Sequence, residues 1–146
     1  MYNLYTAKIQ SELSRTANYH PFDIILRGSI SPTNSVMTAY ISSTTGYTHP
    51  VNAIFLITEN AIPISASNGQ TVLNAVARGY LGTRSFTMTG SGATTLNASI
   101  TSIPYRDSSK LNPVVILQDS STKEIIGAVT EFTLPTEVSY PWQLYN

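Results

Sequence analysis

Short apolar runs with a period of two recur about every ten residues between Pro21 and Leu134, and this pattern limits the fold more than any other feature of the chain. Because successive side chains of a strand point to opposite faces, each such run predicts a strand with one buried face. The chain contains about eight of these runs. The spacing therefore predicts an all-β chain folded as an Ig-like antiparallel β-sandwich of about eight strands, and not a fold of alternating βαβ units.

The sequence from Pro113 to Leu134 predicts a hairpin at the centre of this sandwich. Its first part, Val114–Leu117, is an unbroken apolar run, as expected for a strand covered on both faces. Asp119-Ser120-Ser121 then predicts a turn, because Asp and Ser side chains can accept hydrogen bonds from the backbone just ahead of them. The returning strand alternates, and one face carries Ile126, Ala128, Thr130, Phe132 and Leu134. We therefore expect an interior strand paired with an amphipathic partner.

Three more strands are expected in the first half of the chain. The first carries Phe22, Ile24, Leu26 and Ile30 on one face. Val36–Ser42 returns after a Pro-containing turn at residues 31–34 and makes an antiparallel pair with it. Val51–Thr58 is nearly all apolar and is a second candidate for a central strand. Residues 60–70 contain Pro, Asn and Gly and predict a longer loop.

The segment Thr71–Leu81 fits two structures, because its apolar residues satisfy both helical spacing and strict alternation. These residues are Val72, Val76 and Tyr80. A strand is favoured, since strands are expected on both sides and Gly79 interrupts the pattern. Thr83–Thr89 predicts a separate short strand, and a Gly-Ser-Gly turn at 90–92 follows it. Ala93–Thr101 predicts a strand whose inward residues are Leu96, Ala98 and Ile100.

The two ends of the chain differ from the middle. Residues 2–15 are the one convincing helix, with an apolar stripe formed by Tyr5, Ile9 and Leu13. The tail, residues 135–146, places Val138, Tyr140, Trp142 and Leu144 at alternate positions, as in an extended segment with one apolar face. The expected organisation is an N-terminal helix in residues 1–19, the sandwich in residues 20–134 and the tail in residues 135–146.

The composition excludes several classes of protein. Net charge is zero without a basic cluster, which argues against nucleic acid as a partner, and no apolar run is long enough for membrane insertion. Charged residues make up 11% of the chain, so solubility depends on hydroxyl and amide side chains, a composition that favours a secreted or cell-surface protein. No signal peptide is visible, so an exported chain is expected to be a mature form or an excised domain. The chain has no cysteine, which removes disulfides, zinc–thiolate sites and thiol catalysis.

The sequence contains no arrangement of residues that indicates a reaction, a cofactor or a metal. His20 and His49 each precede a proline in an expected loop, without a second ligand at metal-binding spacing. Asp107 and Asp119 each begin an Asp-Ser-Ser sequence, for which turn capping is expected and a calcium site is the alternative. The carboxylates that remain as a possible acid–base pair lie on different elements, and they are Asp23, Glu59, Glu124 and Glu131. We therefore expect no enzyme, no catalytic residue and no cofactor.

Four tyrosines are candidates for stacking against a sugar ring, and they are Tyr40, Tyr47, Tyr80 and Tyr105. They share no predicted strand, so positions at the core edge or in loops are expected instead. A glycan remains a possible partner in the alternative function.

Four segments together resemble a known arrangement. They are YNLYTAKIQSEL (2–13), IFLITENAIP (54–63), TVLNAVARGYLG (71–82) and VVILQDSSTKEIIGA (114–128). In this order they resemble the Ig-like β-sandwich domain that follows a thioredoxin-like domain in secreted bacterial proteins of the Omp-twenty-eight type. The resemblance spans about residues 2–134 and implies an extracytoplasmic, non-catalytic sandwich used as a spacer, adaptor or surface component. The thioredoxin-like domain is missing here, so no redox activity is implied.

The leading hypothesis is a non-catalytic exported structural or assembly module that associates with itself, as in a filament, or with a neighbouring extracellular protein. The expected assembly surface consists of Tyr5, Ile9 and Leu13 in the helix and Val138, Tyr140, Trp142 and Leu144 in the tail. Leaving these side chains in water would forfeit roughly 1.5–3 kcal/mol for each large residue, so another surface should cover them. Tail and helix can instead cover each other within one subunit. The alternative function is a glycan- or peptide-binding β-sandwich module.

Overall fold

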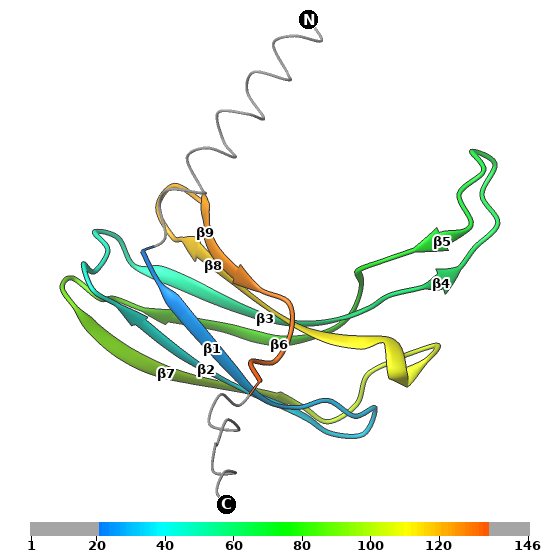
Figure 1. Cartoon of the computed structure of the whole chain (residues 1–146), viewed down its shortest axis with the longest axis horizontal. Helices are drawn as coiled ribbons and strands as arrows, with labels where there is room; N and C mark the ends of the chain where they lie inside the picture. The colour runs from blue at the N-terminus through cyan, green and yellow to red at the C-terminus, as the bar shows by residue number, and fades with distance from the viewer. Residues whose placement is uncertain (1–20, 135–146) are drawn as a thin grey trace, which may run out of the picture.

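The structure is a computed structural model that describes residues 21–134, and these residues form two antiparallel sheets packed face to face (Figure 1). The three-stranded sheet has the order β1-β2-β7, with β1 Asp23–Ser29, β2 Ser35–Ser43 and β7 Gly92–Ile100. The four-stranded sheet has the order β6-β3-β8-β9, with β6 Val76–Phe86, β3 Val51–Glu59, β8 Leu111–Asp119 and β9 Ile125–Val129. The predicted all-β sandwich is confirmed. The predicted helix in residues 1–19 and the tail lie outside the described residues.

The connections between strands follow the Ig-type arrangement of three strands against four. The chain passes from one sheet to the other between β2 and β3, between β6 and β7, and between β7 and β8. A single 3₁₀ turn, η1 (Ser108–Lys110), precedes β8. Within residues 21–134 no helix is long and apolar enough to cross a membrane.

The core lies between the inner faces of the two sheets, where every second residue of β2, β3 and β8 is buried. The apolar residues without solvent exposure are Leu26, Ala39, Ile41, Val51, Ala53, Phe55, Ile57, Val115 and Leu117. The predicted inward residues of the first strand and of β7 also face this core. Phe22 closes one end, with its ring centroid 5.8 Å from that of Tyr47 and 5.5 Å from that of Phe86.

The predicted central strands occupy the interior of the four-stranded sheet, because β3 lies between β6 and β8, and β8 lies between β3 and β9. Burial of β8 on both faces was expected, and this is wrong: Val115 is 0% exposed, whereas Val114 and Ile116 are half-buried. Only the inner face of β8 meets the other sheet. On the outer face the apolar side chains shield each other in cross-strand pairs, in which Ile116 lies opposite Ile54 and Val114 opposite Leu56.

The strand after the Asp-Ser-Ser turn departs from the predicted alternation because of a bulge. The register between β8 and β9 shifts at Leu117/Gln118, which leaves Ile126 as an extra residue. Beyond the bulge Val129 faces inward and Ala128 faces outward, so the expected inward position of Ala128 is wrong. Of the other residues expected on this face, Ile126 and Phe132 pack against the core, whereas Thr130 and Leu134 are exposed.

The segment after residue 70 forms strands, as favoured, but it is divided differently. A two-residue strand, β5 (Val72–Leu73), is followed by the 11-residue β6, which runs through Gly82 without a turn. The separate strand expected at 83–89 is therefore wrong. Strand β6 tolerates this length because two bulges, with Arg78 and Leu81 as the extra residues, accommodate its mismatch with β3.

The predicted loop at 60–70 belongs to an arm, residues 60–75, that projects from the sandwich (Figure 1). It is a hairpin of β4 (Ile62–Pro63) and β5. Two matching contacts close its base. The Asn60 side chain accepts a hydrogen bond from the Ala75 N–H at 2.8 Å, and the Asn74 side chain accepts one from the Ala61 N–H at 2.9 Å. Both alanines are left-handed, with φ of 59° and 57°, so these contacts hold a strained backbone in place.

Candidate functional site

Two buried carboxylates mark opposite ends of the four-stranded sheet. Glu59 ends β3 and Asp119 ends β8, and each residue is 1% exposed. Because β3 and β8 are antiparallel neighbours, Glu59 lies opposite Leu111 and Asp119 lies opposite Val51. Buried charges require hydrogen-bond partners, and both carboxylates have several.

The Glu59 carboxylate holds the segment that leads into β8. Its Oε2 accepts the N–H of Asp107 at 2.6 Å, and its Oε1 accepts the N–H of Arg106 at 2.9 Å. The Arg78 guanidinium donates to Oε1 at 2.8 Å. Burial alone raises the pKa of Glu59, but the two backbone donors and Arg78 outweigh it and hold the pKa below its usual value.

The Asp119 carboxylate joins the β8–β9 turn to the loop before β3. Its Oδ1 accepts the N–H groups of Ser121 and Thr122 at 2.7 and 2.9 Å. Its Oδ2 lies 2.7 Å from both the Tyr47 hydroxyl and the His49 Nδ1. Burial alone raises the pKa of Asp119, but the Tyr47 hydroxyl and the His49 ring outweigh it. Together with the backbone donors they hold this pKa well below its usual value.

These two clusters act as structural anchors, because the oxygens of both carboxylates are already engaged in short hydrogen bonds. Turn capping was predicted for Asp119 and is confirmed, and Asp107 likewise accepts the Ser109 N–H at 3.0 Å. The contacts of Glu59 and the contact of His49 with Asp119 were not predicted from the sequence. A carboxylate at the end of a largely apolar strand, as at Glu59 and Asp119, is the signal that could have indicated a buried acid. Among the described residues no group of three or more His, Asp or Glu side chains could hold a metal ion.

The four candidate tyrosines do not form one binding face. Tyr40 lies on the outer side of the three-stranded sheet, whereas Tyr80 lies on the outer side of the four-stranded sheet, and they are 46% and 58% exposed. Tyr105 lies in the loop before η1, and Tyr47 packs on Phe22. A sugar ring therefore finds no shared aromatic platform among these four residues.

The two sheets of the sandwich have four edge strands, and three of these edges are protected against pairing with another chain. At β1, Thr133 covers Leu26: its N–H donates to the Leu26 carbonyl at 2.8 Å, and its hydroxyl accepts the Leu26 N–H at 3.1 Å. At β6, the two bulges disrupt a regular edge. At β9, the strand has only five residues and one bulge.

The fourth edge, that of β7, lacks these protections. Gly92–Ile100 contains no charged residue and no proline, and it pairs with β2 over nine residues without a register shift. Its inner side chains Leu96 and Ile100 are only partly buried. A long, regular and uncharged edge is a ready template for an added strand.

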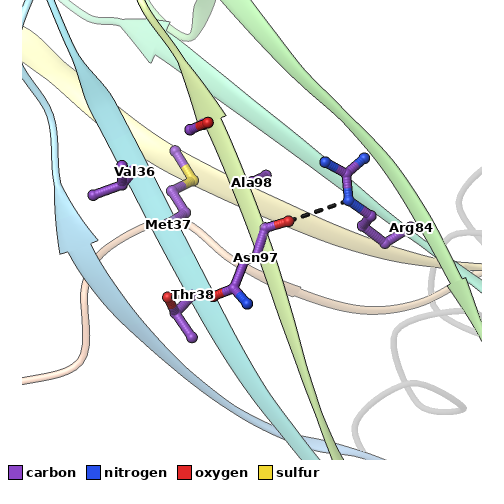
Figure 2. Close-up of a pocket in the computed structure, with 7 residues that line it drawn as sticks. Val36, Met37, Thr38, Arg84, Asn97 and Ala98 are labelled. Carbon is purple, nitrogen blue, oxygen red and sulfur yellow. Dashed lines mark hydrogen bonds between the residues drawn. The ribbon is translucent and has the colours of Figure 1, made fainter.

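One side chain from the other sheet reaches this edge (Figure 2). The Arg84 Nε donates to the Asn97 carbonyl at 3.1 Å, and its Nη1 donates to the Thr83 carbonyl at 3.3 Å. Within residues 21–134 Arg84 has no carboxylate partner. Beside it lies a hollow of about 290 Å³, lined by Val36, Met37, Thr38, Arg84, Asn97, Ala98 and Ser99. The arrangement presents an arginine, exposed hydroxyls and a free strand edge at one place.

The residues predicted from the sequence to form the assembly surface cannot be placed, because all seven lie outside the described residues. They are Tyr5, Ile9, Leu13, Val138, Tyr140, Trp142 and Leu144. The β7 edge is the part of the candidate site that was not predicted from the sequence.

No family model matches the chain, and the comparison with curated proteins gives no match. The chain is similar to part of a β-glucosidase from Kluyveromyces marxianus, with a TM-score of 0.43, 11% identity and coverage of 80% of this chain and 15% of that one. It is also similar to part of a calcium-binding mutant of Bacteroides uniformis β-glucuronidase 2, with a TM-score of 0.36, 9% identity and coverage of 77% and 13%. The chain spans about one seventh of these enzymes' length, and likenesses this distant carry no argument about its function.

Proposed function

We propose that this chain is a non-catalytic structural or assembly module of a secreted or cell-surface protein, and that it associates with itself. The observation that supports this most is the free edge of β7, which is regular over nine residues and uncharged while the other three edges are protected. Such an edge invites β-strand addition, in which backbone hydrogen bonds provide the affinity. A head-to-tail contact of this kind produces rings or open filaments.

Further observations support the non-catalytic part of the proposal and the extracellular location. Two carboxylates whose pKa is lowered, Glu59 and Asp119, are 1% exposed and bonded to loop backbone. Buried acids of this kind stabilise loops and do not meet a substrate. The composition, with 11% charged residues, and the resemblance to secreted Omp-twenty-eight-type sandwiches support an extracellular location. The alternative is a peptide-binding module that offers the same edge to a different protein.

Sedimentation velocity over a wide concentration range tests the proposal. The full chain is expected to form larger species as its concentration rises. Thr95→Pro removes a backbone donor on β7, where proline is tolerated at a free edge, and should leave the chain monomeric. Tyr40→Ser, a change on the outer face of the same sheet, is the matched control and should associate like the unchanged chain. A full chain that is monomeric at every concentration would refute self-association and leave the peptide-binding alternative.

A further inference from the structure

We propose that the β7 edge accepts residues 135–146 of a second copy of this chain as an added strand that runs parallel to β7. This inference rests on the self-association proposed above and names the two surfaces that meet. It follows from the direction of the backbone groups on β7, from the point where the described chain ends, and from the sequence of the tail.

The acceptor is defined by the contact between Arg84 and Asn97. Because the Asn97 carbonyl accepts a hydrogen bond from Arg84 of β6, this carbonyl points away from β2 and toward the free edge. Backbone groups of an antiparallel strand alternate in direction, so Thr95 and Ser99 point the same way as Asn97. The side chains of these three residues lie on the exposed outer face, while Leu96 and Ile100 lie on the inner face and are only partly covered.

The tail of the same subunit is badly placed for this edge. Thr133 is hydrogen-bonded to β1, which lies at the opposite side of the three-stranded sheet from β7. Crossing from beside β1 to beyond β7 takes four strand spacings, or about 19 Å, which uses about six extended residues. The crossing would then use residues 135–140, and Val138 and Tyr140 could not pair with β7. A second copy has no such restriction.

The tail has the pattern that this acceptor requires. Its alternate residues Val138, Tyr140, Trp142 and Leu144 form one set, and Glu137, Ser139, Pro141 and Gln143 form the other. With the first set inward, the apolar side chains extend the inner face beside the partly covered side chains of β7. The polar set then lies on the outer face, next to exposed Thr and Ser hydroxyls of β7.

Pro141 decides the direction of the added strand, because it has no N–H to donate. In an antiparallel pair, residues directly opposite each other on one face exchange both hydrogen bonds, so Pro141 opposite an outward residue of β7 would lose one. In a parallel pair, the outward residues of β7 form backbone hydrogen bonds with tail residues of the apolar, inward set. The nitrogen of Pro141 then faces away, where a missing donor costs nothing. The parallel direction is therefore favoured.

The chain has no cysteine, so single cysteines can report the contact without background. Four equimolar mixtures of full-length variants would be oxidised under mild conditions, each joining an acceptor variant (Thr95→Cys or Ser99→Cys) to a donor variant (Ser139→Cys or Gln143→Cys). Parallel addition with Pro141 beside Asn97 predicts that Thr95→Cys links preferentially to Ser139→Cys, and Ser99→Cys to Gln143→Cys. The preference should be at least about fivefold over the crossed mixtures, since paired Cβ atoms must come within disulfide distance. Tyr40→Cys, on the face of β2, is the acceptor control.

Each other outcome overturns a specific part of the proposal. Preference for the crossed mixtures would show antiparallel addition. Links no stronger than those of Tyr40→Cys, in a chain that still associates by sedimentation, would refute the β7–tail contact but not self-association. A Thr95→Cys/Ser139→Cys double variant that closes an internal disulfide as a monomer would show that the tail pairs within its own subunit. A chain that does not associate at all would refute the proposed function as well.

Discussion

Replacing Val114 and Val115 by alanine, one at a time, tests which face of the central strand is buried. The two valines are neighbours on β8 and lose the same atoms, so the lower β-propensity of alanine cancels in the comparison. Val115 is 0% exposed and faces the other sheet, whereas Val114 is half-buried on the outer face. The difference between the two variants therefore isolates the contribution of the core.

The magnitudes follow from burial. Removing two methyl groups from the core forfeits about 1.6 kcal/mol of transfer free energy, and the cavity adds to it, so Val115→Ala should lower the free energy of unfolding by about 2–3 kcal/mol. Packing around this strand leaves little to fill the space, since Gly127 of β9 lies on the same inner face without a side chain. Val114→Ala should cost about 0.5–1 kcal/mol, because part of its side chain is already in water.

Urea unfolding followed by circular dichroism measures both values, with equal m-values as the check that the denatured states match. Equal costs for the two variants would refute the one-sided burial of β8. Repeating the measurement at several protein concentrations then shows whether another copy covers the outer face, because a cost at Val114 that grows with concentration requires association.

Three further variants test other parts of the structure. Gly28 has φ of 142°, and a Cβ there would lie 2.1 Å from the Val36 carbonyl oxygen. Gly28→Ala should therefore lower the free energy of unfolding in urea by about 2–4 kcal/mol. Gly90→Ala, with open space around it, is the control and should lower it by under about 0.5 kcal/mol. Asp119→Asn should reduce the loss of folding stability that the chain shows between about pH 5 and 2. A carboxyl whose pKa is depressed in the folded state stabilises the fold at pH values above its ordinary pKa of 3.8, and this contribution is lost as the pH falls. Asp23→Asn, at an exposed position, is the control, and an unchanged pH dependence for Asp119→Asn would contradict this role of Asp119. Asn60→Ala should speed hydrogen exchange at the Ala75 amide by tenfold or more, on the order expected when a local opening free energy falls by over 1 kcal/mol, whereas Asn68→Ala at the tip of the arm should leave that amide unchanged.

The sequence pattern predicted the regular strands well, and for a physical reason. β2, β3 and β7 pair over nine residues each with at least one neighbour without a register shift, so period-two alternation maps directly onto their inner and outer faces. β9 was misread because a bulge at Ile126 inserts a residue and reverses the alternation beyond it, and β6 contains two such bulges, at Arg78 and Leu81. A bulge depends on the partner strand, and a single run of residues does not reveal it.

The candidate site was harder to predict, because it depends on which strands become neighbours. Nothing in the residues of β7 differs from those of an interior polar strand; its edge is free because β7 pairs with β2 alone in its sheet. The partners of Glu59 and Asp119 were missed for the same reason, since His49 is 70 positions away from Asp119 along the chain. Turn capping by Asp119, in contrast, acts over two or three residues and could be predicted locally.

Arg84 protects the β7 edge only weakly against an added strand. It covers one carbonyl, that of Asn97, with a hydrogen bond from an exposed side chain, which is worth about 1 kcal/mol. An added strand would supply several backbone hydrogen bonds and cover Leu96 and Ile100, so it should displace Arg84.

Arg84→Met keeps the aliphatic stem, removes the competing donor and should therefore tighten association about fivefold, the factor that corresponds to 1 kcal/mol. Lys123→Met is the matched control, because the exposed Lys123 side chain also donates to one backbone carbonyl, that of Ser120 at 2.8 Å. It lies in the β8–β9 turn, away from β7 and outside the tail, so this change should leave the dissociation constant unchanged. Sedimentation equilibrium measures all three chains. Weaker association of Arg84→Met would mean that the guanidinium contacts the partner, and that Arg84 belongs to the interface and does not compete with it.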